Sequence, residues 1–185
     1  KENVKDIVIP SEEKKIKMYP MDFEEFLMAE GESQLLSYIK DCVKNKKPLI
    51  DGFHKRASYC FKEYMLVGGM PQSVLSYLEN NKNFSKADEA KREILGLYGD
   101  DIKKASKKYR LKISRLFDNI PGFLSKHEKK INLSEVGEKK QFLDYAEALY
   151  WLEDSMICNL CYKCSDPNIG FALTKDDSSL KCYMG

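Results

Sequence analysis

The chain has 185 residues, of which 43% are hydrophobic, 11% aromatic and 32% charged, and its net charge is +2. This composition is typical of one large or two small folded domains, and it excludes collagen, coiled-coil arrays and intrinsic disorder. No apolar run reaches the roughly 18 to 20 residues that a membrane span requires, and the N-terminus lacks a signal-peptide pattern, so we expect no membrane partner and a cytoplasmic location.

The first 30 residues contain two strand-like runs followed by a helix start. Residues 7–9 and 16–19 are short and β-compatible, and a charged turn separates them. After Pro20, Asp22 and Glu25 have the spacing of a capping box, in which each side chain accepts a hydrogen bond from the backbone N–H of the other residue. The sequence therefore predicts that a helix begins immediately after Asp22.

The next hundred residues have a helical pattern. Apolar side chains recur at three- and four-residue intervals in the ranges 35–43, 59–67, 74–78, 87–105 and 109–120.

Glycine, serine and proline residues divide this pattern into separate helices. A break is expected at residues 68–71, and Ser85 is expected to begin a longer helix that Gly96 and Gly99 weaken or bend. Pro121 is expected to end the last of these helices.

The last 60 residues have a different order of elements. A short segment at 133–137 precedes a long helix predicted over 139–156. Residues 157–164 alternate like a strand, 166–170 form a turn, and 180–184 are the expected return strand. Helix, short helix, long helix and two-stranded ribbon is the order of a winged helix-turn-helix.

A cysteine-rich motif lies in the predicted strand. Cys158, Cys161 and Cys164 are spaced C-x-x-C-x-x-C, with Cys182 as a fourth candidate, which is a spacing that iron–sulfur clusters use. Because a strand directs Cys161 away from Cys158 and Cys164, we favour structural thiols over a metal site or a redox pair, and we assign no metal ligands.

Basic residues concentrate in one stretch of the chain. Residues 51–140 carry a net +7 and residues 141–185 a net −4, and the range 103–130 holds ten Lys and Arg but two acidic residues. Such a stretch is most often a solvated face, but it can also neutralise the phosphates of a nucleic acid. Residues 141–156, the expected recognition helix, contain no Lys or Arg, which disfavours the usual major-groove contact. The candidate nucleic-acid contacts are Lys107, Lys108, Arg110, Lys112 and Arg115.

The sequence contains no self-sufficient catalytic site. It has neither a G-x-x-x-x-G-K-[ST] phosphate-binding loop nor a Ser/His/Asp constellation, and we assign no catalytic residues. The turn Gly68-Gly69-Met70-Pro71 has two interpretations: a helix end followed by a new helix start, or a place where a ligand approaches the backbone.

Five motifs, in order along the chain, resemble AAA-type ATPases of the archaeal-ATPase-like group of bacteria and archaea. The motifs are KMYPMDFEEFL (17–27), YMLVGGMP (64–71), RLFDNIP (115–121), ALYWLED (148–154) and LKCYMG (180–185). Each motif is weak alone, but their order and spacing are fairly specific.

This resemblance implies a mainly α fold in three parts. Residues 1–20 would be the tail of a nucleotide-binding sheet, 21–105 a helical lid, and 106–185 a winged helix-turn-helix with a small two-stranded β ribbon. The chain would be a middle fragment, as the absence of an initiator Met also suggests, with its ATPase core upstream of Lys1 and with family members commonly continuing into a nuclease-like domain.

The resemblance also implies a function and a site. Related ATPases carry a G-x-P in the lid whose Pro packs on the nucleotide, so Gly69 and Pro71 are the candidate contacts to ATP in the intact protein, with Mg²⁺ held by the upstream core. We therefore expect a regulatory part, inactive alone, that couples nucleotide state to DNA or a protein partner. The alternative is a nucleic-acid-binding module that uses the surface around residues 103–130.

Overall fold

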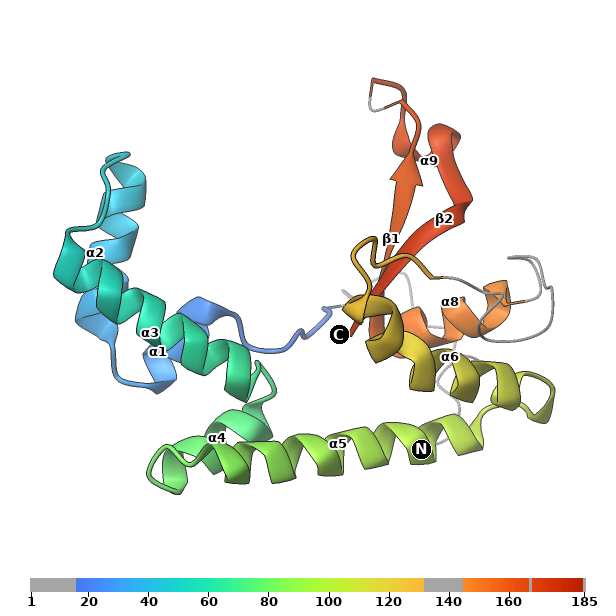
Figure 1. Cartoon of the computed structure of the whole chain (residues 1–185), viewed down its shortest axis with the longest axis horizontal. Helices are drawn as coiled ribbons and strands as arrows, with labels where there is room; N and C mark the ends of the chain where they lie inside the picture. Colours follow the sequence, from blue (N-terminus) through green and yellow to red (C-terminus); the bar gives the residue numbers. More distant parts are fainter. Residues whose placement is uncertain (1–15, 132–144, 167, 185) are drawn as a thin grey trace.

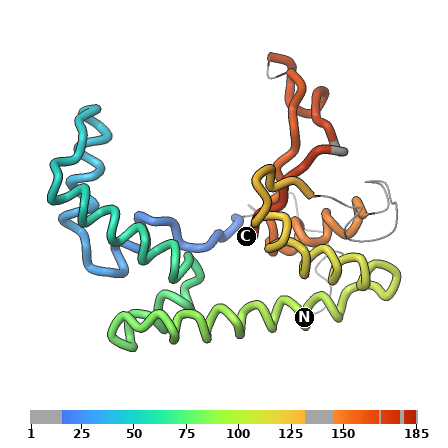
Figure 2. Tube along the Cα trace, viewed as in Figure 1, coloured from blue at the N-terminus to red at the C-terminus, as the bar shows by residue number. Residues whose placement is uncertain are grey.

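The computed structural model describes residues 16–131, 145–166 and 168–184, and it divides them into two groups of elements joined by one long helix. The first group consists of α1 (Phe23–Ala29), α2 (Ser33–Lys44), α3 (Asp51–Val67) and α4 (Pro71–Glu79). The joining helix is α5 (Phe84–Lys104). The second group consists of α6 (Lys107–Ser125), α8 (Ala146–Asp154), β1 (Cys158–Cys164), α9 (Phe171–Thr174) and β2 (Lys175–Met184). The two groups lie at opposite ends of α5 (Figure 1), and Figure 2 shows the same path along the chain.

The start of α1 has the predicted capping box. The N–H of Glu25 donates to Asp22 Oδ1 at 2.8 Å, and the N–H of Asp22 donates to Glu25 Oε2 at 2.9 Å. Two of the helix N–H groups that lack an intrahelical partner are thereby satisfied, so α1 begins where the sequence predicts. The helix then directs Phe26 and Leu27 into two neighbouring cores of the first group.

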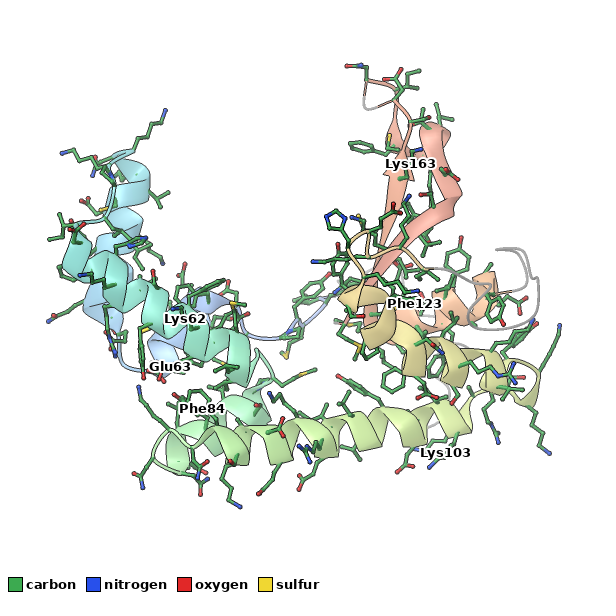
Figure 3. The ribbon with its side chains drawn as sticks, in the orientation of Figure 1. Lys62, Glu63, Phe84, Lys103, Phe123 and Lys163 are labelled. Atoms are coloured by element: carbon green, nitrogen blue, oxygen red, sulfur yellow. The ribbon has the colours of Figure 1, made fainter. Side chains whose placement is uncertain are left out.

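A buried acidic residue lies in the first group. Glu63 of α3 is only 4% exposed, and the hydroxyl of Tyr77 from α4 donates to its Oε1 at 2.7 Å. Figure 3 shows Glu63 near the start of α5, where Phe84 contacts the ring of Tyr77. Burial and the hydrogen bond to Glu63 raise the pKa of Tyr77 above its ordinary value, so this hydroxyl stays protonated and continues to donate.

The second group has the winged-helix order that the sequence predicts for its described parts. Strands β1 and β2 pair antiparallel, with Leu160 opposite Cys182. An isolated bridge between Lys130 and Lys181 extends this ribbon on the β2 side. The ribbon and helices α6 and α8 enclose one core. The prediction of a mainly helical chain with a small C-terminal two-stranded ribbon is confirmed.

Helix α5 contributes to the cores of both groups. Ala87, near its N-terminal end, packs with α1, α3 and α4, whereas Ile102, near its C-terminal end, packs with α6, α8 and the ribbon. The two groups therefore share a structural element, and the predicted boundary at residue 105 falls just after it. No helix in the described ranges, α5 included, is both long enough and apolar enough to cross a membrane.

Three predicted helix boundaries are wrong. Helix α5 is capped by Asn83, whose side chain accepts from the N–H of Ser85, so Ser85 is inside the helix and not its cap. Helix α6 does not end at Pro121 but continues to Ser125. Proline removes one backbone hydrogen bond, but burial of Ile120 and Phe123 on either side keeps this part of the helix packed against the core.

The third wrong boundary concerns the helix predicted over 139–156. Helix α8 begins at Ala146, and Tyr145, with φ −113° and ψ −6°, is its N-cap, so the predicted helix does not extend through Tyr145. The predicted part at 139–144 lies outside the described residues. The side chain of Tyr145 is buried in the second core. Apolar periodicity reports which side chains face a core, and not whether the backbone between them is continuous.

The strand predicted at 16–19 does not form. Ile16 and Met18 are 82% and 87% exposed, and no strand among the described residues pairs with this segment. A strand needs a pairing partner, because its backbone hydrogen bonds are all made to a neighbour. The predictions for residues 7–9 and 133–137 lie outside the described residues.

We expect Tyr77→Phe to destabilise the protein by about 1 to 3 kcal/mol, because it leaves the buried carboxylate of Glu63 without its hydroxyl donor. Urea unfolding followed by circular dichroism measures this difference. Tyr59→Phe is the matched control, because Tyr59 is 54% exposed and should tolerate the change. Equal stability of the two variants would show that the Tyr77 hydroxyl does not stabilise the fold.

Candidate functional site

The glycine turn between α3 and α4 has the geometry of a helix end followed directly by a helix start. Gly68 caps α3 with φ +82°, in the left-handed region that favours glycine, and its N–H donates to Tyr64 O at 2.8 Å. Pro71 is the first residue of α4, where its fixed φ suits the helix and no N–H is needed. The local sequence thus accounts for both ends of the turn.

Gly69 is the point where the turn contacts the segment that precedes α1. The N–H of Met21 donates to Gly69 O at 2.7 Å, and the hydroxyl of Tyr64 donates to Met21 O at 2.8 Å. A Cβ on Gly69 would lie 2.3 Å from Met21 O and 3.1 Å from the Cβ of Pro20. The absence of a side chain at Gly69 is therefore explained by this internal contact.

Pro71 differs from Gly69 in being exposed. The turn therefore has an exposed proline ring, while its second glycine is in close contact with the backbone of Met21. For a nucleotide in this position, the available contact is the ring of Pro71, because a direct approach to Gly69 would meet the Pro20–Met21 segment. Of the two candidate residues, Pro71 is thus accessible to solvent, whereas Gly69 contacts the Met21 backbone.

The five basic candidates on α6 do not form one surface. Lys107 and Arg110 face α5 and line a groove between the two helices. Lys108, Lys112 and Arg115 follow each other at intervals of four and three residues, and they lie on a different face of α6. The five residues are neighbours in the sequence, but each residue of a helix is turned by 100° around the axis from the one before it, so the side chains point in different directions.

The second basic face is adjacent to α8. Lys108 and Arg115 are exposed, whereas Lys112 is half-buried with its ammonium 5.7 Å from the centre of the Tyr145 ring. Helix α8 itself contains Glu147 and Glu153 and no Lys or Arg. A duplex approaching this side would meet basic side chains on α6 and acidic ones on α8.

The cysteine motif is distributed over both faces of the ribbon, as its alternation predicts. Cys158 is buried, Cys164 is half-buried and Cys161 is exposed on the opposite face. Cys158 instead contacts Cys182, also buried, through a thiol–thiol hydrogen bond, which together with burial raises the pKa of the Cys158 thiol. In the described part of the chain, no cluster of three or more His, Cys, Asp or Glu has the arrangement of a metal site.

The structure contains a groove that the sequence analysis missed. It lies between α5 and α6, has a volume of 520 Å³, and combines apolar with basic lining residues. Leu95 and Leu111 lie on its two walls although they are 44% and 62% exposed. The available signal is one exposed leucine on each helix, but only the pairing of the two helices brings these leucines into one groove.

Gly69→Ala and Gly96→Ala should change stability in opposite directions. The Cβ at position 69 clashes with Met21 O, so we expect a loss of about 1 to 3 kcal/mol. Gly96 lies within α5 with no neighbouring atom within 4 Å of its ideal Cβ, so alanine there should stabilise by about 0.5 to 1 kcal/mol. Thermal unfolding of both variants measures the two effects, and a neutral Gly69→Ala would contradict the close contact.

Residues 59–185 match a family described as Domain of unknown function (DUF8612). No curated protein and no solved structure matches the chain. The matched region begins within α3 and contains the glycine turn, α5, the groove and the ribbon. Because the function of this family is unknown, the resemblance to AAA-type ATPases stays a prediction from the sequence. Since the match covers more than half of the chain, the protein belongs to the DUF8612 domain family.

Proposed function

We propose that the chain is the helical lid and winged helix of an ATP-binding AAA-type regulatory ATPase, inactive alone, whose ATPase core precedes it in the same polypeptide. The observation that carries this proposal is the glycine turn. Its exposed Pro71 lies two residues from Gly69, which is hydrogen-bonded to the segment that would connect the lid to that core. A nucleotide at Pro71 would thus lie beside the connection between the two parts.

In this proposal the chain's own residues contact the nucleotide and link it to the connecting segment. The ring of Pro71 contacts the base, and the Gly69–Met21 hydrogen bond keeps the connecting segment against the turn. ATP with Mg²⁺, bound mainly by the upstream core, supplies the free energy of hydrolysis. The proposed compartment is the cytoplasm.

Helix α5 is the proposed route from the turn to the winged helix. Its 21 residues span about 32 Å, and its ends are packed into different cores. Because the two ends of α5 are packed into the two cores, a displacement of α4 beside the nucleotide would be passed on to α6 and the ribbon. The winged helix would then present a different surface to its partner in each nucleotide state.

The coding sequence gives the first test of this proposal. It requires a G-x-x-x-x-G-K-[ST] motif after a strand, on the N-terminal side of Lys1 in the same reading frame. A reading frame without this motif would overturn the proposal.

In the full-length protein, we expect Pro71→Ala to weaken ATP binding by about threefold to tenfold, because it removes roughly 1 kcal/mol of apolar packing against the base. Fluorescence anisotropy of a labelled ATP analogue measures the affinity. Pro121→Ala is the matched control, since Pro121 is also an exposed proline within a helix and should leave the affinity unchanged. Equal affinities of the two variants would remove Pro71 from the site.

A second candidate function is nucleic-acid binding through α6. One observation supports it: Lys108 and Arg115 are exposed on the same face of this helix, with Lys112 between them. The acidic side chains of α8 place this candidate second, because they would repel phosphates from the helix that usually enters the major groove.

If the second candidate is correct, the chain binds a DNA duplex at about 50 mM salt, and the affinity falls steeply as salt is raised. The variant Lys108→Glu with Arg115→Glu should then reduce the slope of log affinity against log salt by about 1 for each phosphate that the protein no longer neutralises. A filter-binding titration measures this slope. No binding at about 50 mM salt would remove the candidate.

A further inference from the structure

We propose that the groove between α5 and α6 is a docking site for an acidic amphipathic helix of a partner protein. The groove lies where α5 ends and α6 begins, and its volume is 520 Å³. Lys103, labelled in Figure 3, marks the α5 side of this junction. The proposal concerns a different surface from the nucleotide contact at Pro71 and does not depend on it.

The floor of the groove is apolar and accessible. Ile102 is buried and Phe117 half-buried, and Leu95 and Leu111 add their exposed side chains on either side. Leucines that are 44% and 62% exposed and line the same groove leave apolar surface in contact with water. Covering them with apolar side chains of a partner would remove this surface from water and stabilise a complex.

The rim of the groove is basic. Lys103, Lys107 and Arg110 line it, and Asp118 is the acidic residue among the lining side chains. Lys103 also pairs with Asp100 at 2.8 Å, but both side chains are largely exposed, so this pair yields readily to a competing carboxylate. The charge complementary to this rim is negative.

Arg110 indicates more specifically that the occupant of the groove is negatively charged. Its Nε is buried and has no hydrogen-bond partner among the described residues, while its guanidinium donates to Ala105 O at 3.3 Å. A buried donor without an acceptor is unfavourable, because it has lost its hydrogen bond to water. Because Arg110 lines the groove, a carboxylate of a partner there would accept a hydrogen bond from its guanidinium.

The length of the groove matches that of a short helix. Its lining runs from Leu95 to Lys103 on α5 and from Lys107 to Asp118 on α6, which corresponds to about 12 and 16 Å of helix axis. Two to three turns of a docked helix have roughly this length, and they present apolar side chains at three- and four-residue intervals. A nucleic-acid backbone would match the basic rim but would leave Leu95 and Leu111 in contact with a polyanion.

The probe for this site is a fluorescein-labelled peptide of about 16 residues, with Leu at helical intervals on one face and Glu on both flanks. We expect saturable binding by fluorescence anisotropy. Leu111→Ser and Lys107→Glu should each weaken it by about tenfold. The matched controls are Leu97→Ser, at an exposed leucine of α5 outside the groove, and Lys108→Glu, the adjacent lysine on the other face of α6, and both should stay within about twofold of wild type. Circular dichroism melting of each variant ensures that a loss of binding is not a loss of folding.

Three results would overturn the proposal. The first is no saturable binding up to about 1 mM peptide, and the second is equal weakening by the groove variants and their controls. The third is undiminished binding of a peptide with Lys in place of every Glu. If a DNA duplex binds and Leu111→Ser abolishes that binding while the peptide does not bind, the groove is a nucleic-acid surface instead. All these outcomes are independent of ATP affinity, so they do not depend on the result for Pro71.

Discussion

The contact between the glycine turn and Met21 holds the first group of helices together. Met21 is hydrogen-bonded through its N–H to Gly69 and through its carbonyl to Tyr64, so the segment before α1 is attached to the end of α3 and the start of α4. This attachment positions α1 so that Phe26 packs against Val67 in the shared core. The contact requires a residue without a Cβ at position 69, and the same turn carries the exposed proline on which the proposed nucleotide contact depends.

Local patterns predicted the elements whose causes are local. The capping box of α1, the glycine end of α3 and the alternating ribbon each depend on residues close together in the sequence, and all three form as expected. Where an element depends on tertiary contacts, the prediction from local sequence is wrong. Helix α6 continues past Pro121 because the core packs around it. The 16–19 segment is not a strand, because a strand depends on a neighbour and no described strand pairs with it.

The candidate site was predictable only in part, for a related reason. The glycine turn is contiguous in sequence, so its two candidate residues could be named, but the close approach of Met21 to Gly69 joins positions 48 residues apart and has no sequence signature. The basic residues of α6 form one cluster in the sequence, whereas the helix places Lys107 and Lys108 on different faces. The groove combines Leu95 and Leu111 from two helices, and no single-helix pattern contains it.

The participation of α5 in two cores has a mechanical consequence. Its N-terminal part is fixed by the first group and its C-terminal part by the second, and Gly96 lies between these attachments with no neighbouring side chain against it. The turn around Gly96 is therefore a part of α5 where no side chain adds to the stiffness of the helix. Glycine lowers that stiffness, because it adds no side-chain contacts and permits more backbone conformations than any other residue. Bending of α5 at this turn is therefore one factor that sets the angle between the two groups, and the 17–20 segment, which lines a pocket with residues of α8 and β1, is another.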